Sequence, residues 1–320
     1  MNLVEQASHA PVLHIGIPNP MFEGDLNLYV IAGDPLTLVD TGIGTPEALA
    51  ALEAGLAGHG LALADVKQVL LTHKHADHIG LAADIRERSG ATVYIHEDDW
   101  PGVADLDRRH GEFLPLVLER LQMARVPQEE IDKLTKFLGH GKRFARQTEA
   151  EKLQDGDTFE ISGQTLEVIH TPGHTQGCVS FRYGRHLFTG DHVLPTISPN
   201  IGAGEMRRTG MMQRFLDALD RIATYQTDDL VALPGHGPAF SNLAERCAQL
   251  RDHHLKREET ILNVLRERGE PLTIYEVAQS LWSKLPGYHV VLGISEVNSH
   301  LEKAVADGLV VEEDGRFRLV

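Results

Sequence analysis

The chain has 320 residues, of which 42% are hydrophobic and 24% are charged, and its formal net charge is −16. This composition is that of a globular protein without low-complexity tracts, and the acidic balance disfavours binding that depends on wrapping a phosphate backbone. The two cysteines, Cys178 and Cys247, argue against a disulfide scaffold and favour a reducing compartment. No apolar run approaches the roughly 20 residues that span a bilayer, and residues 1–20 lack a signal-peptide pattern. We therefore expect a soluble, cytoplasmic protein with no membrane partner.

The first hundred residues alternate between strand and helix patterns. Two β-rich runs, 26–33 and 36–42, are joined by a Gly-Asp-Pro turn and predict a hairpin-like pair. The spacing of apolar residues then predicts a helix, a strand, a second helix and another strand, at 45–60, 66–72, 80–90 and 91–97. Such alternation is typical of an α/β layered domain.

Residues 105–150 change character and predict a helical insertion. Two stretches, 113–126 and 127–147, have helical rather than strand patterns. The insertion ends in a small basic cluster made of Lys142, Arg143 and Arg146, with His140 beside them. This cluster could receive a carboxylate or phosphate of a substrate, or it could be a solvated helix face, and both interpretations stay open.

Strand patterns return at residue 151, and the sheet domain is expected to end near 240–250. Short β-rich runs precede an amphipathic helix at 211–225 and a strand at 230–238. The runs themselves cover 158–171, 178–184 and 186–191.

The C-terminal residues predict three helices and a hairpin, which is the order of elements in a winged-helix domain. The helices are expected at 253–270, 273–285 and 294–309, and the hairpin, with an Asp-Gly turn, at 309–320. From 253 to 320 there are eight lysines and arginines against eleven acidic residues. A helix that reads DNA needs basic and amide side chains, so a structural role or a role in forming a homodimer is favoured.

The densest group of ionisable residues follows the strand predicted at 66–72. His73, His75, Asp77 and His78 stand within six positions of one another, in the sequence Thr-His-Lys-His-Ala-Asp-His. Imidazole and carboxylate groups are ligands of borderline transition metals, and such groups cost free energy when they are buried without a partner. A bound metal would offset the repulsion among these ionisable groups and would give their buried polar atoms a partner.

Three more candidate ligands stand at the ends of later strands. His174 lies in Thr-Pro-Gly-His, Asp191 in Phe-Thr-Gly-Asp and His236 in Pro-Gly-His-Gly-Pro. Functional groups of α/β proteins gather in loops at strand ends, and the neighbouring glycines permit turns that other residues resist.

These motifs, together with Leu-Val-Asp-Thr-Gly at 38–42, resemble the metallo-β-lactamase superfamily in its glyoxalase-II-like arrangement, over about residues 10–245. The resemblance implies an αββα sandwich with a dinuclear metal site at one edge. The expected fold is therefore α/β, with a metallo-β-lactamase sandwich over 1–250, a helical insertion at about 105–150 and a small winged-helix domain over 251–320.

The resemblance also implies a role for each candidate ligand. His73, His75 and His174 would bind the first metal, and Asp77, His78 and His236 the second, with Asp191 bridging the two. A metal-bridging hydroxide would be the nucleophile, oriented by the catalytic residue Asp77. Asp40 would accept an N–H from a ligand histidine and set its tautomer. The two divalent metals are expected to be Zn²⁺, while iron and manganese also suit seven N/O ligands.

Three hypotheses for function follow. The first is a hydrolase of a small thioester, ester or lactone. The second is a metal-dependent endoribonuclease that acts on single-stranded RNA, because the layout of hydrolase and winged helix resembles the β-lactamase-like protein 2 group, some of whose members are linked to RNA cleavage. The third, ranked last, is a winged-helix DNA-binding regulator with a metal-sensing domain. β-Lactamase activity is not expected, because antibiotic-degrading members often have a cysteine at the position of Asp191.

Overall fold

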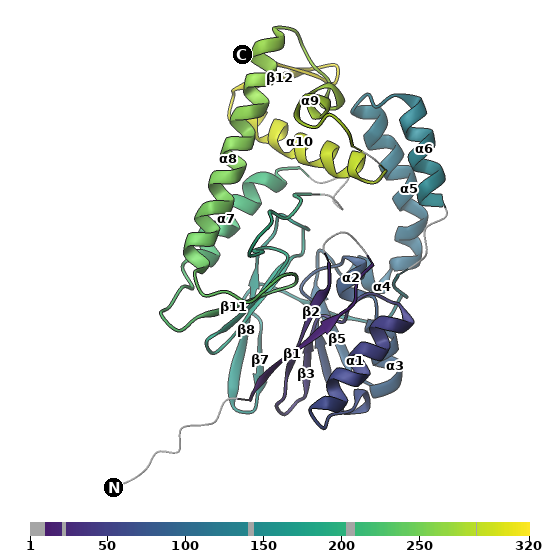
Figure 1. The fold of residues 1–320 in the computed structure, drawn as a ribbon, viewed down its shortest axis with the longest axis vertical. Helices are drawn as coiled ribbons and strands as arrows, with labels where there is room; N and C mark the ends of the chain where they lie inside the picture. The colour runs from purple at the N-terminus through teal and green to yellow at the C-terminus, as the bar shows by residue number, and fades with distance from the viewer. Residues whose placement is uncertain (1–9, 21–23, 140–143, 203–208, 286) are drawn as a thin grey trace.

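Two β-sheets face each other in the lower part of the molecule, and a helical part stands above them (Figure 1). The structure is a computed structural model that describes residues 10–20, 24–139, 144–202, 209–285 and 287–320.

The first sheet has six strands that are adjacent in chain order. The first strand pairs antiparallel with the second and the second antiparallel with the third, and the three remaining pairings are parallel. The strands are β1 (Val12–Ile17), β2 (Leu26–Ile31), β3 (Thr37–Val39), β4 (Gln68–Leu70), β5 (Thr92–His96) and β6 (Glu151–Leu153).

The second sheet has five strands in the order β11-β10-β9-β8-β7. Its pairings are antiparallel except for that of β10 with β11, which is parallel. The strands are β7 (Thr158–Ile161), β8 (Gln164–His170), β9 (Val179–Tyr183), β10 (His186–Gly190) and β11 (Val231–Pro234).

Helices cover the outer faces of both sheets. On the first sheet these are α1 (Pro46–Gly58) and α3 (Ala82–Ser89), with the short η1 (Leu63–Asp65), and on the second they are α7 (Met211–Ala223) and α8 (Leu243–Arg268). Residues at the start of α1 and at the end of α3 explain where these helices begin and end. The Thr45 hydroxyl accepts a hydrogen bond from the Ala48 N–H and caps α1, and Gly90 ends α3 with a φ of 71°.

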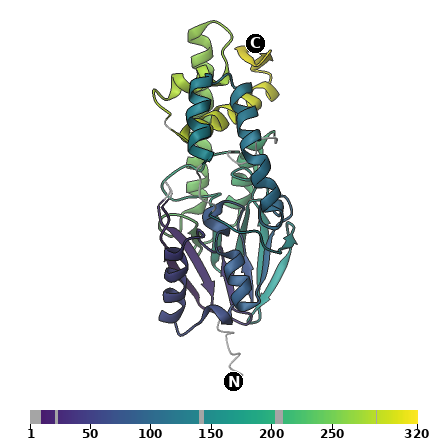
Figure 2. The same cartoon turned by 90° about the vertical axis from the view of Figure 1, so that its right-hand side faces the viewer.

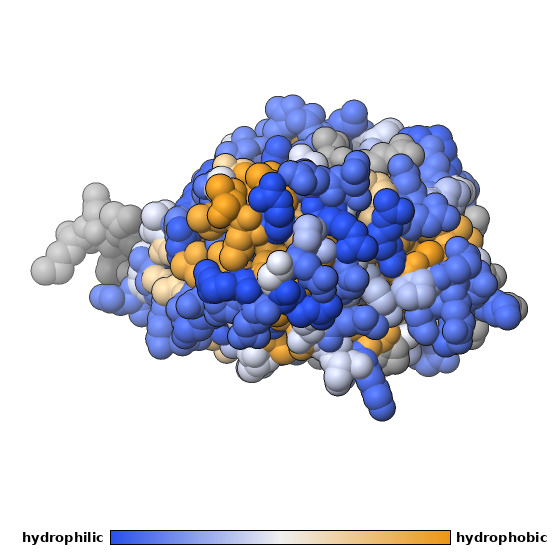
Figure 3. Space-filling view, turned by 90° about the horizontal axis from the view of Figure 1, so that it is seen from above, coloured by the Kyte–Doolittle hydropathy of each residue, from blue (hydrophilic) through white to orange (hydrophobic). Residues whose placement is uncertain are grey.

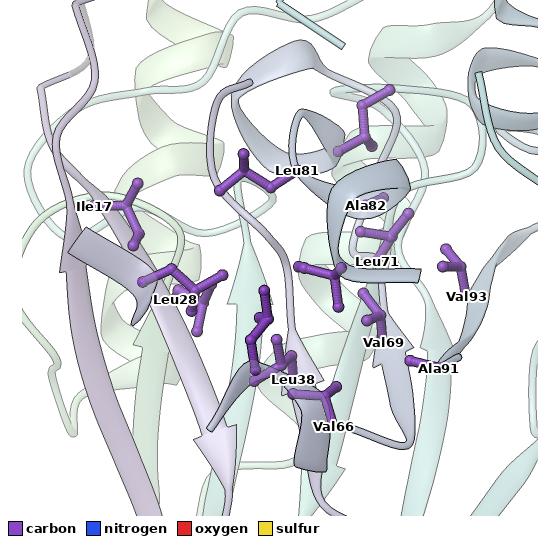
Figure 4. Close-up of a cluster of buried hydrophobic side chains, with 14 of the residues drawn as sticks. Ile17, Leu28, Leu38, Val66, Val69, Leu71, Leu81, Ala82, Ala91 and Val93 are labelled. Atoms are coloured by element: carbon purple, nitrogen blue, oxygen red, sulfur yellow. The ribbon is translucent and has the colours of Figure 1, made fainter. Parts of the chain in front are cut away.

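Apolar side chains fill each of the three interfaces between layers. Between the sheets, Tyr29 and Leu70 pack with Phe181 and Phe188. Figure 4 shows the cluster between the first sheet and its helices, with Leu38, Val69 and Leu71 among the labelled residues. Each such buried side chain contributes about 1.5–3 kcal/mol. The predicted α/β sandwich of two sheets between helices is confirmed, and both sheets are mixed.

The insertion and the C-terminal residues form one helical unit. Figure 2 shows the insertion helices standing beside the C-terminal helices. They share a core in which Leu121 and Ile131 of the insertion join Ile261 and Val297 of the C-terminal part. The elements of this unit besides the end of α8 are α5 (Leu106–Met123), α6 (Gln128–Gly139), α9 (Ile274–Leu281), α10 (His289–Ala306), β12 (Val310–Glu313) and β13 (Arg316–Leu319). The short α4 (Pro101–Ala104), which precedes α5, packs with its Val103 in the core of the first sheet.

The C-terminal elements appear in the predicted order of three helices and a hairpin. The assignment to the winged-helix class stays a prediction. Helix α8 runs without a break through position 250, where the sequence suggested a domain boundary, so a helix and not a linker connects the sheets to the C-terminal unit.

The second insertion helix is shorter than predicted. The sequence suggested a helix through residue 147, but α6 ends at Gly139 and residues 144–150 form neither helix nor strand. His140, Lys142 and Arg143 of the basic cluster lie outside the described residues. The remaining residue, Arg146, forms ion pairs with Asp84 and Glu87 of α3, so its charge is already matched within the protein.

The surface of the helical unit carries apolar patches among polar side chains, as the view from above shows (Figure 3). Leu309 and Val320 are among the exposed large hydrophobic residues, at 44% and 81% exposure. Within the described residues, no helix is both long enough and apolar enough to cross a membrane.

Gly80 is a point of close backbone contact and provides a test of the fold. A Cβ at this position would lie 2.1 Å from the backbone nitrogen of Gly44 and 2.6 Å from the carbonyl oxygen of Phe144. We expect Gly80→Ala to lower the free energy of unfolding by about 1–3 kcal/mol, because backbone atoms cannot move aside cheaply. Urea unfolding followed by circular dichroism measures the change.

Gly58→Ala is the matched control, because a Cβ at Gly58 meets no heavy atom within 4 Å at the end of α1. This substitution should leave stability unchanged or raise it by about 0.5–1 kcal/mol through helix propensity. Equal unfolding midpoints for the two variants would contradict the close backbone packing at Gly80.

Candidate metal centre

The predicted site residues come together at one edge of the sandwich, where strands from both sheets end. Each loop at this edge follows a buried strand, so the sheets fix its position. Asp40 follows β3, the segment from His73 to His78 follows β4 and includes α2 (Ala76–Ile79), His174 follows β8, Asp191 follows β10, and His236 follows β11.

The first group consists of three histidines whose ring nitrogens converge. Nδ1 of His75 lies 3.1 Å from Nε2 of His73 and 2.9 Å from Nε2 of His174. These are the three residues that the resemblance assigned to one metal, and their ligand atoms lie close enough to share one ion.

The second group consists of Asp77, His78 and His236. Oδ2 of Asp77 lies 3.3 Å from Nε2 of His236 and 3.9 Å from Nε2 of His78. These ligand atoms also lie close enough to share one ion. The structure thus places together the three residues that the resemblance assigned to the other metal.

Asp191 lies between the two groups. Its Oδ1 is 3.5 Å from Nε2 of His78 in the second group, and its Oδ2 is 3.8 Å from Nε2 of His174 in the first. The same Oδ2 lies 3.7 Å from Nε2 of His236. A carboxylate in this position can contact ions in both groups, as the resemblance implied.

Four of the ligand histidines present their other ring nitrogen to a protein oxygen. Such contacts fix the orientation of an imidazole and raise its basicity toward a metal. The pairs are His73 Nδ1 with the Thr72 hydroxyl (3.0 Å), His78 Nδ1 with Asp40 Oδ2 (2.8 Å), His174 Nδ1 with the Asn200 carbonyl (2.8 Å) and His236 Nδ1 with the Asp25 carbonyl (3.2 Å).

Asp40 occupies the position that the sequence suggested for it, beside a ligand histidine. Its backbone is left-handed, with a φ of 60°, a conformation that Asp and Asn adopt more readily than most residues. The carboxylate accepts hydrogen bonds from the N–H and the hydroxyl of Thr72, at 2.8 Å each, as well as from His78. Asp40 therefore joins the loops after β3 and β4.

Burial and neighbouring charge hold four of these groups, His73, His75, Asp77 and Asp191, in forms that bind a metal. Burial lowers the pKa of His73 well below its usual range and that of His75 to about 3, so both imidazoles are neutral at pH 7. Burial alone would raise the pKa of Asp77, but the charges of His78 and His75 and the contact with His236 together outweigh it, and the pKa falls to about 2. Burial is likewise outweighed at Asp191 by His78, His236 and His174 together, which leave its pKa below the usual range. The carboxylates raise the pKa values of His78 and His236 in spite of burial. Neutral imidazole and ionised carboxylate are the states that coordinate metals, so His78 and His236 would release a proton when a metal binds.

The chemistry of the donor atoms fits a metal. Three buried polar atoms at this edge have no hydrogen-bond partner among the described residues, namely His78 Nε2, Asp191 Oδ1 and His236 Nε2. A buried polar atom left without a partner costs about 1–3 kcal/mol, and a cation among these atoms would satisfy them. The candidate groups contain nitrogen and oxygen donors and no thiolate, a set that suits zinc, iron or manganese.

Asp99 is a buried residue of this region that sequence reasoning missed. Its Oδ2 accepts hydrogen bonds from the N–H of Lys74, at 3.1 Å, and from the hydroxyl of Thr175, at 2.5 Å. It also forms an ion pair with the Lys74 ammonium at 3.2 Å. Lys74 and Thr175 are chain neighbours of ligand histidines, so Asp99 ties two ligand loops together. Its position soon after β5, at the same sheet edge, was the signal available in the sequence.

Two asparagines were also missed. Asn19 donates from Nδ2 to Oδ2 of Asp77 at 3.2 Å. Asn200 accepts from His174 through its carbonyl and donates from its side chain to the carbonyl of Leu292 in α10, at 3.1 Å. No sequence motif marks Asn200, because its role depends on a contact 92 residues away along the chain.

Replacing Asp40 by asparagine tests the proposed orientation of His78. Asparagine tolerates the left-handed backbone but has only one acceptor oxygen, so it cannot serve both Thr72 and His78. We expect Asp40→Asn to weaken metal affinity by about 10–100-fold, measured by competition with a chromophoric zinc chelator. Asp314→Asn is the matched control, because Asp314 has a φ of 52° in the turn between β12 and β13, among the C-terminal elements. Equal affinities in the two variants would show that Asp40 does not support the metal centre.

Comparison with known proteins agrees with this geometry. The family model described as "Metallo-beta-lactamase superfamily" matches residues 23–236. The chain is 29% identical over 311 residues to the "Probable metallo-hydrolase YqjP" of Bacillus subtilis, with 92% of each chain covered. It is 25% identical over 312 residues to the "Beta-lactamase-like protein 2 homolog" of Caenorhabditis elegans, covering 96% of this chain and 88% of that protein.

More distant relatives and solved structures extend the comparison. An "Atrochrysone carboxyl ACP thioesterase" of Aspergillus chevalieri is 25% identical over 273 residues, covering 81% of this chain and 68% of that protein. The crystal structure of a metallo-beta-lactamase family protein from Thermus thermophilus superimposes with a TM-score of 0.81 at 30% identity, covering 97% of this chain and 98% of that one. The chain therefore belongs to the metallo-beta-lactamase superfamily.

Proposed function

We propose that this protein is a metal-dependent hydrolase that cleaves a small acyl thioester, or an ester or lactone of similar size, with two divalent cations at the metal centre. One observation carries the proposal. Six histidine and aspartate ligands form two adjacent groups with Asp191 between them, which is the arrangement that two-metal hydrolysis requires. Zinc is the metal we expect first.

The residues of the centre have two roles, namely to bind the cations and to accept a proton from the attacking water. His73, His75 and His174 would hold one cation, and Asp77, His78 and His236 the other, with Asp191 shared. When bound, such cations lower the pKa of a coordinated water and polarise the scissile carbonyl.

Asp77 is the group we assign to proton transfer. Its carboxylate is ionised at neutral pH, because burial, which would raise its pKa, is outweighed by the charges of His78 and His75 and the contact with His236 together, and the pKa is held at about 2. The Asn19 amide, which donates to Oδ2 at 3.2 Å, orients it. Hydrolysis adds the water oxygen to the acyl carbon and breaks the carbon–sulfur bond. Asp77 would accept the first proton of the water and deliver it to the departing thiolate, and the second proton leaves the product carboxylic acid to solvent.

A large cleft lies in the helical unit, between α5 and α10. The cleft has a volume of about 1650 Å³ and is lined by apolar residues of α5 and α10, among them Leu121, Val291 and Ile294. This volume exceeds the roughly 300–1,000 Å³ of ordinary ligand pockets. None of the candidate metal ligands lines it, but its wall includes Gly202, two residues beyond the Asn200 carbonyl that contacts His174. The cleft therefore has room for an acyl chain with its carrier arm.

The charges around this cleft disfavour RNA as the substrate. Among its described lining residues, three are basic and five are acidic: Arg120, Arg125 and Lys303 against Glu119, Glu302, Asp307, Glu312 and Asp314. Lys303 is also paired with Glu258 and Asp307. A polyphosphate backbone needs an excess of positive charge. Relatives that carry the name thioesterase support the acyl alternative.

The environment of α10 disfavours the DNA-binding regulator. Ten of its 18 residues are buried, and it packs against α5, α7, α8 and α9. A recognition helix must offer an exposed face to the major groove. Because most of α10 is covered by other helices of the same chain, this mode of binding is blocked.

A substrate panel tests the proposed function. We expect zinc-loaded protein to hydrolyse acyl thioesters of N-acetylcysteamine, with release of the thiol followed by a colorimetric reagent. Asp77→Asn should lower kcat/KM by about 10²-fold or more, because the variant loses both a ligand and a proton acceptor.

The control is Asp229→Asn, which changes an exposed aspartate whose carboxylate accepts a hydrogen bond from the Thr227 hydroxyl and should leave kcat/KM unchanged. The same preparations are incubated with esters, lactones and unstructured single-stranded RNA. Metal-dependent cleavage of RNA without turnover of any acyl substrate would overturn the proposal in favour of the endoribonuclease.

A further inference from the structure

A second cluster of metal-binding side chains lies in the helical unit, apart from the metal centre. His254 comes from α8, and Glu296 and His300 come from α10. All three are buried, with 1%, 8% and 1% of their surfaces exposed. The cluster shares no residue with the candidate metal centre at the sheet edge.

The geometry of this cluster is close to that of a metal site. Oε1 of Glu296 lies 3.7 Å from Nδ1 of His254 and 3.6 Å from Nε2 of His300, and one ligand atom from each residue lies within 4.8 Å of the others. Zinc–nitrogen bonds of roughly 2.0–2.1 Å place two tetrahedral ligands about 3.3 Å apart, so a small closing movement suffices. Glu296 and His300 are four residues apart on one helix and therefore share a face.

Three ring nitrogens of the cluster are available to bind a metal. Nδ1 of His254 and both ring nitrogens of His300 have no hydrogen-bond partner among the described residues. The other nitrogen of His254, Nε2, lies 3.0 Å from the hydroxyl of Ser198. If Nε2 carries the proton and donates to Ser198, the lone pair of Nδ1 points toward Glu296. This is the tautomer that a metal at the cluster requires.

The charge balance of the cluster also favours a cation. Burial alone would raise the pKa of Glu296, but its neighbours, His300 first, lower it, so the carboxylate is ionised. Burial lowers the pKa of His254 to about 4, so this imidazole is neutral at pH 7. Arg257 and His253 of α8 also act on these groups electrostatically, but Arg257 stacks on the Trp282 ring, 4.9 Å from its centre. A buried carboxylate between two imidazoles is stabilised by a cation bound among them.

We propose that His254, Glu296 and His300 bind one divalent transition metal of the zinc class, as a structural site separate from the metal centre. The metal would link α8 to α10 through two nitrogens and one oxygen, leaving a fourth position for water.

The cluster is connected to the metal centre through one loop. Ser198 contacts His254, and Asn200, two residues further on, contacts both His174 and α10. Phe215 packs on His254 and also on His192, which follows Asp191 in the chain, with ring centres 5.2 and 5.0 Å apart. A metal that fixes α10 against α8 would therefore also steady the loop that orients His174.

Metal content measured by inductively coupled plasma mass spectrometry tests the site. Protein is stripped with a chelator, reloaded with Zn²⁺ or Co²⁺, and separated from free metal by gel filtration. We expect His300→Gln and Glu296→Gln each to hold one metal equivalent per chain less than the wild type. Added Zn²⁺ should raise the melting temperature less in these variants than in the wild type.

His253→Gln is the matched control, because His253 is the exposed neighbour of His254 on α8 and belongs to none of the ligand groups. It should retain the full metal content. Asp77→Asn, at the other centre, should leave the cobalt absorption of the cluster in place. The two centres can then be lost independently, so failure of this proposal is distinguishable from failure of the proposed hydrolase function.

Crystals of the unmodified protein give a test that does not depend on a variant folding. An anomalous difference map at the zinc edge should show a peak between the three side chains. A map with peaks at the sheet edge and none at the cluster, with metal content unchanged by His300→Gln, would overturn the proposal and leave a buried cluster of polar side chains in its place.

Discussion

The hydrogen bonds that Asp40 accepts from Thr72 and His78 hold together the edge of the sandwich on which the metal centre is built. A buried carboxylate is costly unless its oxygens are satisfied, and here both oxygens accept bonds from the loop that follows β4. The left-handed backbone of Asp40 turns its side chain toward that loop. His78 can therefore point Nε2 at Asp191, and the other strand ends supply the rest of the ligands. Asp99 makes a corresponding connection between the His73–His75 segment and Thr175.

The sequence was most informative where function depends on local spacing. The candidate ligands from His73 to His78 stand within six positions on one loop, and glycine-rich turns mark His174, Asp191 and His236, so motif and resemblance pointed to all seven. The structure brings these seven residues together in overlapping groups at one edge of the sandwich. Helix ends with a clear cap, such as Thr45 and Gly90, were predicted close to their observed positions.

What the sequence could not show depends on contacts between distant segments. Asn200 acquires its role only because α10 packs beside the loop after β10, and Asp99 only because β5 lies next to β4. The cluster of His254, Glu296 and His300 joins residues of two helices that lie more than 40 positions apart along the chain, and no local pattern distinguishes those residues from an ordinary polar helix face. The early end of α6 was missed for a different reason, since the residues after Gly139 have a helical composition but adopt no helix up to β6 in their described part.

Helix α8 begins on the outer face of the second sheet and ends in the core that the insertion shares with the C-terminal helices. Helix α8 is continuous at position 250 and rises by about 1.5 Å per residue. There is therefore no hinge at this position between the helical unit and the sandwich. A fragment that stopped there would expose the apolar faces of α5 and α6, which pack on Ile261 and Val297 in the intact chain. The insertion and the C-terminal segment therefore share one packed core, so a change in the size of an apolar side chain on either segment has to be accommodated by the other.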